Sequence, residues 1–189
     1  MSLSSSTESS STDLSWSCTA ETASFIANQI GRRSQAGSGA LQHRRLTVLG
    51  LSPDGHHGSS RYQRSPRQRG LDEIRLCAQL LREGAQLVVL DRPRNRLLIE
   101  TLLPLAADRD GRILGDIHLE ANLSSAFWAA DAVLLLPGWR PERPLAWGAL
   151  ASRLQPGAEV FDLRPGGACD RAAACGLRLW HLGSFAAVL

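Results

Sequence analysis

An aspartate and an arginine two residues apart, Asp162 and Arg164, follow a short apolar run and precede a Pro-Gly-Gly turn. The planar guanidinium of an arginine offers two parallel hydrogen bonds, which suit a phosphate or a carboxylate. An arginine at the end of a strand and among glycines therefore fits the binding of an anionic ligand. An ordinary surface ion pair with a nearby carboxylate explains the same residues equally well, and the pattern alone favours neither interpretation.

A second concentration of cations lies between Arg61 and Arg75. All 21 basic residues of the chain are arginines, and the formal net charge is +3. The absence of lysine excludes Schiff-base chemistry and a P-loop. The run contains one tyrosine, Tyr62, and lacks the interleaved aromatics of nucleic-acid-binding segments. We expect a solvated loop and helix start here, with an anion-facing loop as the alternative, and no nucleic-acid partner.

Histidine and cysteine spacings predict no metal site. His56 and His57 are adjacent, and Cys169 and Cys175 are six residues apart, which fits neither a CxxC pair nor a zinc knuckle. The first residues resemble no secretory signal, so the four cysteines are expected to be reduced thiols in a cytoplasmic protein. No apolar run is long enough to span a bilayer, and no membrane association is expected.

Short apolar runs alternate with helical patterns along most of the chain. Strands are expected at residues 46–51, 86–91, 112–117, 132–136, 160–162 and 177–182, and helices at 16–33, 71–83, 94–105, 120–130, 145–154 and 168–175. The core strands show no polar alternation, which indicates a parallel sheet buried on both faces. The predicted fold class is α/β, a three-layer Rossmann-like parallel sheet with helices on both faces.

The domain organisation follows from the composition. Residues 1–15 are rich in serine and threonine and are expected to form a disordered tail. Residues 16–40 form a short helical leader and a Gly/Ser linker, and residues 41–189 form the Rossmann-like domain. Ligands of such sheets bind beyond the carboxyl ends of the strands. Trp139 and Arg164 fall in two turns at this edge, although filling of the core is the alternative role for the tryptophan.

Four stretches of this domain, in their order and spacing, resemble the C-terminal UDP-binding domain of the UDP-glucose/GDP-mannose dehydrogenase family. They are RRLTVLGLSPDG, LLREGAQLVVLDRP, ADAVLLLPGWRPERPLAWGALASRLQPG, and EVFDLRPGG with the RAAACGLRLWHLG that follows it. The resemblance covers about residues 41–183. Enzymes of that family use NAD to oxidise the C6 alcohol of a nucleotide-linked sugar to a carboxylate.

The resemblance implies a nucleotide-sugar-binding domain whose ligand is a UDP-sugar. Arg164 of the Asp-x-Arg turn would hold the nucleotide-sugar, and Arg61, Trp139 and Asp162 complete the expected binding residues. It also implies a homodimer or association with a chain that carries the NAD-binding domain. No cofactor is expected in this chain, because the family binds NAD through an N-terminal domain that has no counterpart here.

Departures from the family pattern limit the expected activity. The catalytic cysteine motif is absent, and Asp54 stands where the family has a phosphate-binding lysine. We therefore expect binding without dehydrogenase activity of the chain on its own. One alternative is half of a split NAD-dependent UDP-sugar dehydrogenase. Another is a degenerate relative of nucleoside 2-deoxyribosyltransferases, whose ADAVLLLPGW-like strand precedes a nucleophilic glutamate that would fall near Gly148 here. A purely structural interaction module also stays open.

Overall fold

The structure is a computed structural model that describes residues 19–32, 41–51, 66–90, 99, 115–139, 144–164 and 170–181. The expected helix at 94–105, apart from Ile99, lies outside this part of the chain. The same holds for the tail, for Arg61 and for Asp54.

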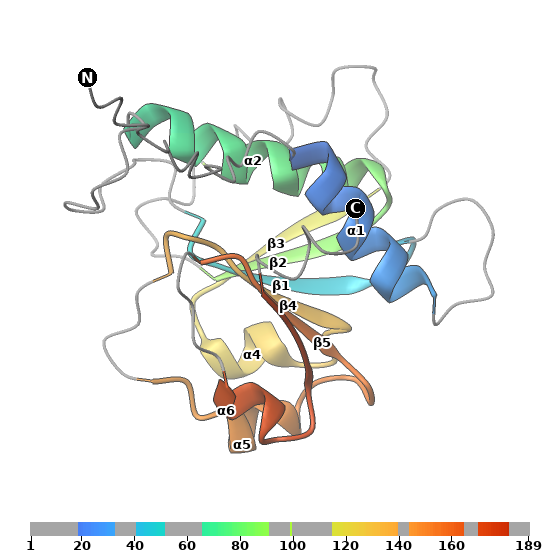
Figure 1. The fold of residues 1–189 in the computed structure, drawn as a ribbon, viewed down its shortest axis with the longest axis vertical. Helices are drawn as coiled ribbons and strands as arrows, with labels where there is room; N and C mark the ends of the chain where they lie inside the picture. Colours follow the sequence, from blue (N-terminus) through green and yellow to red (C-terminus); the bar gives the residue numbers. More distant parts are fainter. Residues whose placement is uncertain are drawn as a thin grey trace, which may run out of the picture.

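A six-stranded sheet forms the centre of the domain (Figure 1). Its strands are β1 Arg45–Leu49, β2 Gln86–Leu90, β3 Asp116–Glu120, β4 Ala132–Leu135, β5 Glu159–Asp162 and β6 Arg178–His181. Their order is β3-β2-β1-β4-β5-β6, and all neighbouring pairs are parallel. The direction of strand order reverses between β1 and β4, as in doubly wound nucleotide-binding folds. The predicted parallel sheet is confirmed.

Helices cover both faces of the sheet. Helices α1 (Thr19–Gly31) and α2 (Pro66–Arg82) lie on one side, and α4 (Leu123–Phe127), α5 (Trp147–Ala151) and α6 (Asp170–Ala173) lie on the other (Figure 1). This arrangement confirms the predicted three-layer fold. None of the helices in the part of the chain that the structure describes is both long and apolar enough to span a bilayer.

Alternate residues of the strands build two hydrophobic clusters. Val48, Leu134 and Phe161 belong to the cluster beneath α1 and α2. Leu49 and Leu135 belong to the cluster beneath α4, α5 and α6. Because successive side chains of a strand point to opposite faces, continuous apolar runs are what a sheet buried on both sides requires.

The leader helix α1 is part of the core. Phe25 meets the ring of Trp180 edge-on at a centroid distance of 5.3 Å, and Trp180 stacks on Phe161 at 6.5 Å. Buried Ile26 and Ile30 continue the apolar face of the helix. The α1 helix therefore packs against β6 through the contact of Phe25 with Trp180.

Two elements, α2 and β3, differ most from their predicted boundaries. Helix α2 begins at Pro66 instead of residue 71, so Asp72 and Glu73 do not lie in its first turn. Proline is favoured at the first helical position, because its missing N–H has no partner there anyway. Glu73 is buried within the helix instead of facing the dipole at its start. The α2 helix therefore extends into the arginine-rich segment that was interpreted as mostly loop.

The third strand also lies further along the chain than predicted. It spans residues 116–120, whereas the sequence favoured 112–117. Its polar residues alternate with Ile117 and Leu119, because β3 is an edge strand whose apolar residues face only the α1–α2 side. Gly115 precedes it where a Cβ would collide with the backbone carbonyl of Ala85. The strand therefore begins immediately after the glycine.

A buried thiol on α2 leads to a prediction about pH. Cys77 is fully buried, and burial raises the pKa of its thiol, with a further contribution from the carboxylate of Glu73. In the unfolded chain the thiol ionises near its ordinary pKa of about 8.5. The stability that Cys77 contributes is therefore complete below that pH and is lost as the pH rises above it. The contribution of Cys77 to the free energy of unfolding, measured with urea, should be about 2 kcal/mol smaller at pH 10 than at pH 7.

The Cys77→Ala variant provides the reference for this measurement. It loses packing at every pH, but it has no thiol at this position to ionise on unfolding. The difference in unfolding free energy between the wild type and the variant should therefore shrink between pH 7 and pH 10. Parallel pH profiles of the two proteins would show that the thiol ionises as readily in the folded state.

Candidate functional site at the carboxyl edge of the sheet

Three turns meet at the carboxyl edge of the central strands. They follow β1 at Gly50, β4 at Leu136–Trp139 and β5 at Leu163–Arg164. The strand register aligns their starting points, because Leu49 pairs with Leu135 and Leu135 pairs with Asp162. The sheet therefore brings together Trp139, Asp162 and Arg164 at the edge that the sequence predicted.

Gly50 allows the turns after β1 and β4 to touch. Its φ is +86°, and a Cβ at this position would lie 2.5 Å from the Cα of Trp139. Leu136 donates its N–H to the carbonyl of Leu49 at 2.9 Å, and Trp139 donates its N–H to the carbonyl of Leu136 at 2.9 Å. This contact places Trp139 directly at the reversal point of the strand order.

The indole of Trp139 combines packing with an unused hydrogen-bond donor. The partly buried ring packs against the cluster beneath α4, α5 and α6. Trp139 therefore helps to fill the core, which was the alternative role expected from the sequence. Its Nε1, however, is buried and has no hydrogen-bond partner among the residues that the structure describes. Buried indole N–H groups usually have one, and leaving such a donor without an acceptor costs free energy. A ligand acceptor would remove that cost only if the turn after β4 moved to expose the atom, because Nε1 has almost no accessible surface.

Asp162 and Arg164 form a close ion pair. Nε and Nη2 of Arg164 donate to the two carboxylate oxygens of Asp162 at 2.8 and 2.7 Å, and the backbone N–H of Arg164 donates to Oδ1 at 3.2 Å. The side chain of Asp162 is 0% exposed and that of Arg164 is 20% exposed. The ion-pair interpretation of this turn therefore holds, and the pair fixes the guanidinium at the edge of the sheet. A ligand would meet an arginine whose charge is already balanced.

One residue at this edge was missed by the sequence analysis. His181 is the last residue of β6, and its Cα pairs in register with that of Asp162. Paired residues of parallel strands point to the same face, so the partly buried imidazole lies on the side of α6. The run LRLWHL carried no signal for this placement, because it requires the register between β5 and β6.

Helix α2 also points its start toward this edge. Its end lies at the opposite edge of the sheet, where Gly84 approaches Gln42 and Gln86 donates to the carbonyl of Arg44. A helix of 17 residues is about 25 Å long, whereas the strands span about 16 Å. The N-terminus of α2 therefore reaches the side on which the strands end (Figure 1).

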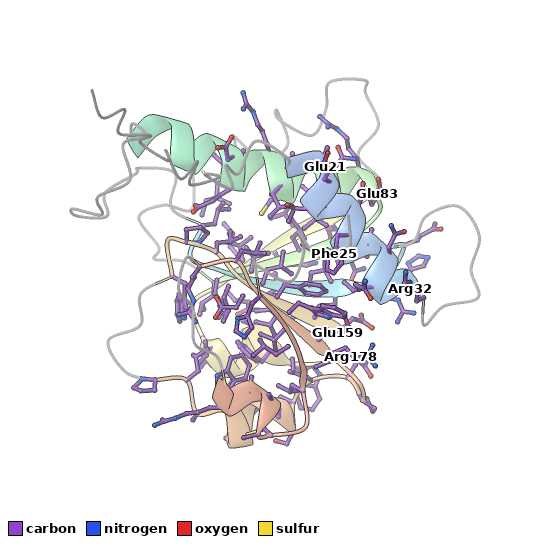
Figure 2. The ribbon with its side chains drawn as sticks, in the orientation of Figure 1. Glu21, Phe25, Arg32, Glu83, Glu159 and Arg178 are labelled. Atoms are coloured by element: carbon purple, nitrogen blue, oxygen red, sulfur yellow. The ribbon has the colours of Figure 1, made fainter. Side chains whose placement is uncertain are left out.

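Ion pairs at the amino edge have structural roles. Asp131 accepts from Nη1 of Arg44 at 2.8 Å and from the backbone N–H of Arg45 at 2.9 Å, which joins β1 to β4. Buried Glu159 accepts from Nε1 of Trp180 at 2.9 Å and from Arg178 at 3.4 Å (Figure 2). No group of three histidine, cysteine or acidic side chains suited to a metal occurs among the residues described.

The comparisons with known proteins identify no relative. No protein-family model matches the chain, and no curated protein matches it. The resemblance to the UDP-binding domain of the dehydrogenase family therefore stays a prediction based on the four quoted stretches. The fold and the residues at the carboxyl edge are the structural facts on which a function can be proposed.

Proposed function

We propose that the domain binds a nucleotide-sugar of the UDP-sugar class at the carboxyl edge between β1 and β4. The observation that carries this proposal is the strand order, which reverses between these two strands. In open parallel sheets the loops at such a reversal diverge to opposite faces, and ligands bind in the crevice between them. Gly50 and Trp139 meet at this point in the present fold.

The start of α2 supports a place for the diphosphate. The first N–H groups of a helix have no partner within the helix, and together with the helix dipole they favour a bound phosphate. The segment from Arg61 to Arg75, which overlaps this helix, carries five arginines, and the chain has a net charge of +3. A diphosphate would therefore meet positive potential at this end of the sheet. The negative charge of Asp54, which precedes α2 in the sequence, would oppose a bound diphosphate.

Two residues of the crevice are assigned roles in binding. Nε1 of Trp139 would donate to an oxygen of the ligand, which would give this buried donor its partner. Arg164 would contact the ligand from a position that Asp162 holds in place. Arg61 is the fourth expected binding residue and lies five residues before the start of α2 in the sequence.

Dehydrogenase activity of the chain alone is not part of the proposal. Dehydrogenases of the family that the sequence resembles need a reactive thiol. Cys77 does not supply one, because it is buried and its raised pKa keeps it protonated. Cys175 is exposed and lies between α6 and β6, near the amino edge of the sheet. Oxidation of a bound sugar would require a partner chain with an NAD-binding domain. The glycosyltransfer alternative has no support at Gly148, which is exposed on α5.

Calorimetric titration of UDP-glucose and UDP at low salt tests the proposal. The wild type should bind with a dissociation constant on the order of micromolar. The Trp139→Phe variant keeps a ring but loses the N–H donor, and its affinity should fall about three- to tenfold. The Arg164→Gln variant should also bind more weakly, although it leaves the buried Asp162 without its cation. The tryptophan variant is therefore the cleaner test.

Arg178→Gln is the matched control for the arginine variant. Arg178 also pairs with a buried carboxylate, that of Glu159, but it lies at the amino edge of the same sheet. Its substitution should leave the affinity unchanged. No heat from the wild type at millimolar ligand would contradict the proposed function. Equal losses in the Arg164 and Arg178 variants would indicate an effect on folding instead of a contact with the ligand.

A further inference from the structure

His181 stands next to the Asp162–Arg164 pair at the end of the sheet. The Cα atoms of His181 and Asp162 are register partners, and both side chains are on the α6 side. Asp162 is fully buried and holds Arg164 through an ion pair. The pair is therefore a rigid neighbour of the imidazole. Within the described part of the chain, the imidazole of His181 makes no hydrogen bond or ion pair, whereas its backbone belongs to the β5–β6 ladder. Its ring nitrogens are therefore not committed to the fold there.

The charge balance at this place favours an uncharged ligand group. Asp162 and Arg164 neutralise each other, which makes the β5–β6 end a poor site for a second phosphate. A neutral imidazole offers one donor and one acceptor. A sugar hydroxyl is likewise a donor and an acceptor, so the two groups complement each other without a change in charge.

The distance from β4 to β6 also favours a sugar ring, and not the diphosphate, as the ligand group near His181. The crevice lies between β1 and β4, and β6 is two strands beyond β4, about 10 Å away at the usual strand spacing. A diphosphate at the crevice does not reach that far. A sugar ring attached to the diphosphate would supply the additional length needed to reach β6.

We propose that His181 is a specificity-determining residue that hydrogen-bonds to a hydroxyl group of a sugar ring in the bound nucleotide-sugar. This inference rests on the proposed function and adds to it the part of the ligand that lies over β5 and β6. The ring is either the hexose or the ribose, since both carry neighbouring hydroxyls on either side of the diphosphate. A set of truncated ligands separates these two sources.

Titration of UDP-glucose, UDP and 2′,3′-dideoxy-UDP into the wild type and a His181→Ala variant tests the inference. The variant should bind UDP-glucose about three- to tenfold more weakly, the loss expected for one hydrogen bond. If UDP binding is unaffected, the hydroxyl belongs to the hexose. If UDP binding is weakened equally and dideoxy-UDP binding is not, the hydroxyl belongs to the ribose. A His181→Gln variant, which keeps a donor and an acceptor, should recover part of the affinity.

His118→Ala is the matched control, because His118 is an exposed histidine on the opposite edge strand, β3, where it pairs with Asp116. This variant should bind all three ligands as the wild type does. Unchanged affinity of the His181→Ala variant for UDP-glucose would overturn the inference and leave the proposed function intact. An equal loss for all three ligands would also overturn it. Absence of binding by the wild type would overturn the proposed function and this inference together.

Discussion

The Gly50→Ala substitution is expected to lower the free energy of unfolding by about 3–5 kcal/mol. Two costs add at this position. The backbone has a φ of +86°, which an alanine adopts only with strain, and the new Cβ would lie 2.5 Å from the Cα of Trp139 and 2.6 Å from its Cβ. The turns after β1 and β4 would have to separate. Because a domain of this size is stable by only about 5–15 kcal/mol, urea unfolding would detect the loss readily.

Gly176→Ala separates the two costs. Gly176 has a similar φ of +80°, but no atom lies within 4 Å of the position of a Cβ there. Its substitution should therefore show only the backbone cost, about 1 kcal/mol. The excess loss in Gly50→Ala measures the close approach of the two turns. If the two variants lose equal stability, the contact between Gly50 and Trp139 is not tight in solution.

The Gly50 variant also connects the fold to the proposed site. If the crevice between β1 and β4 binds the nucleotide-sugar, separation of its two turns should weaken binding even at temperatures where the variant is folded. Gly176 lies at the end of α6, away from this crevice, and its variant should bind normally. A folded Gly50→Ala protein that binds UDP-glucose as the wild type does would place the ligand elsewhere.

The fold could be predicted from the sequence because its strands are buried on both faces. The runs that became β2 and β4 are apolar almost throughout. β1 and β5 contain polar residues, but all of their residues except Arg45 are buried. Such runs leave few alternatives to a parallel sheet. β3 was misplaced because it is an edge strand, where His118 and the acidic residues beside it face outward and resemble a loop.

The candidate site could be predicted only in part. The turn at Arg164 was placed at the correct edge, because the carboxyl end of a strand is defined by local sequence. The sequence did not decide which partner the arginine takes, since that depends on a bend of two residues that returns it to Asp162. His181 was missed for a different reason. Its neighbourhood is created by the register between β5 and β6, which no local pattern specifies.

Removal of the arginine from the Asp162–Arg164 pair should destabilise the fold by about 3 kcal/mol. In an Arg164→Met variant the carboxylate of Asp162 stays fully buried and loses both charge-assisted hydrogen bonds, one of 2.8 Å and one of 2.7 Å. An unpaired buried charge costs about 3–5 kcal/mol, and the 20% exposure of Arg164 places the expected value at the lower end. Urea unfolding at neutral pH is the appropriate measurement.

The double variant Asp162→Leu/Arg164→Met tests whether the loss of stability comes from the unpaired charge of Asp162. Apolar replacement of a whole buried pair is often neutral or stabilising, so the double variant should be within about 1 kcal/mol of the wild type. If it is as unstable as the single variant, the turn itself depends on the hydrogen bond from the backbone N–H of Arg164 to Asp162. A stable double variant also separates folding from function. Because it has a sound fold without the arginine, any loss of UDP-glucose binding in it can be assigned to the ligand contact.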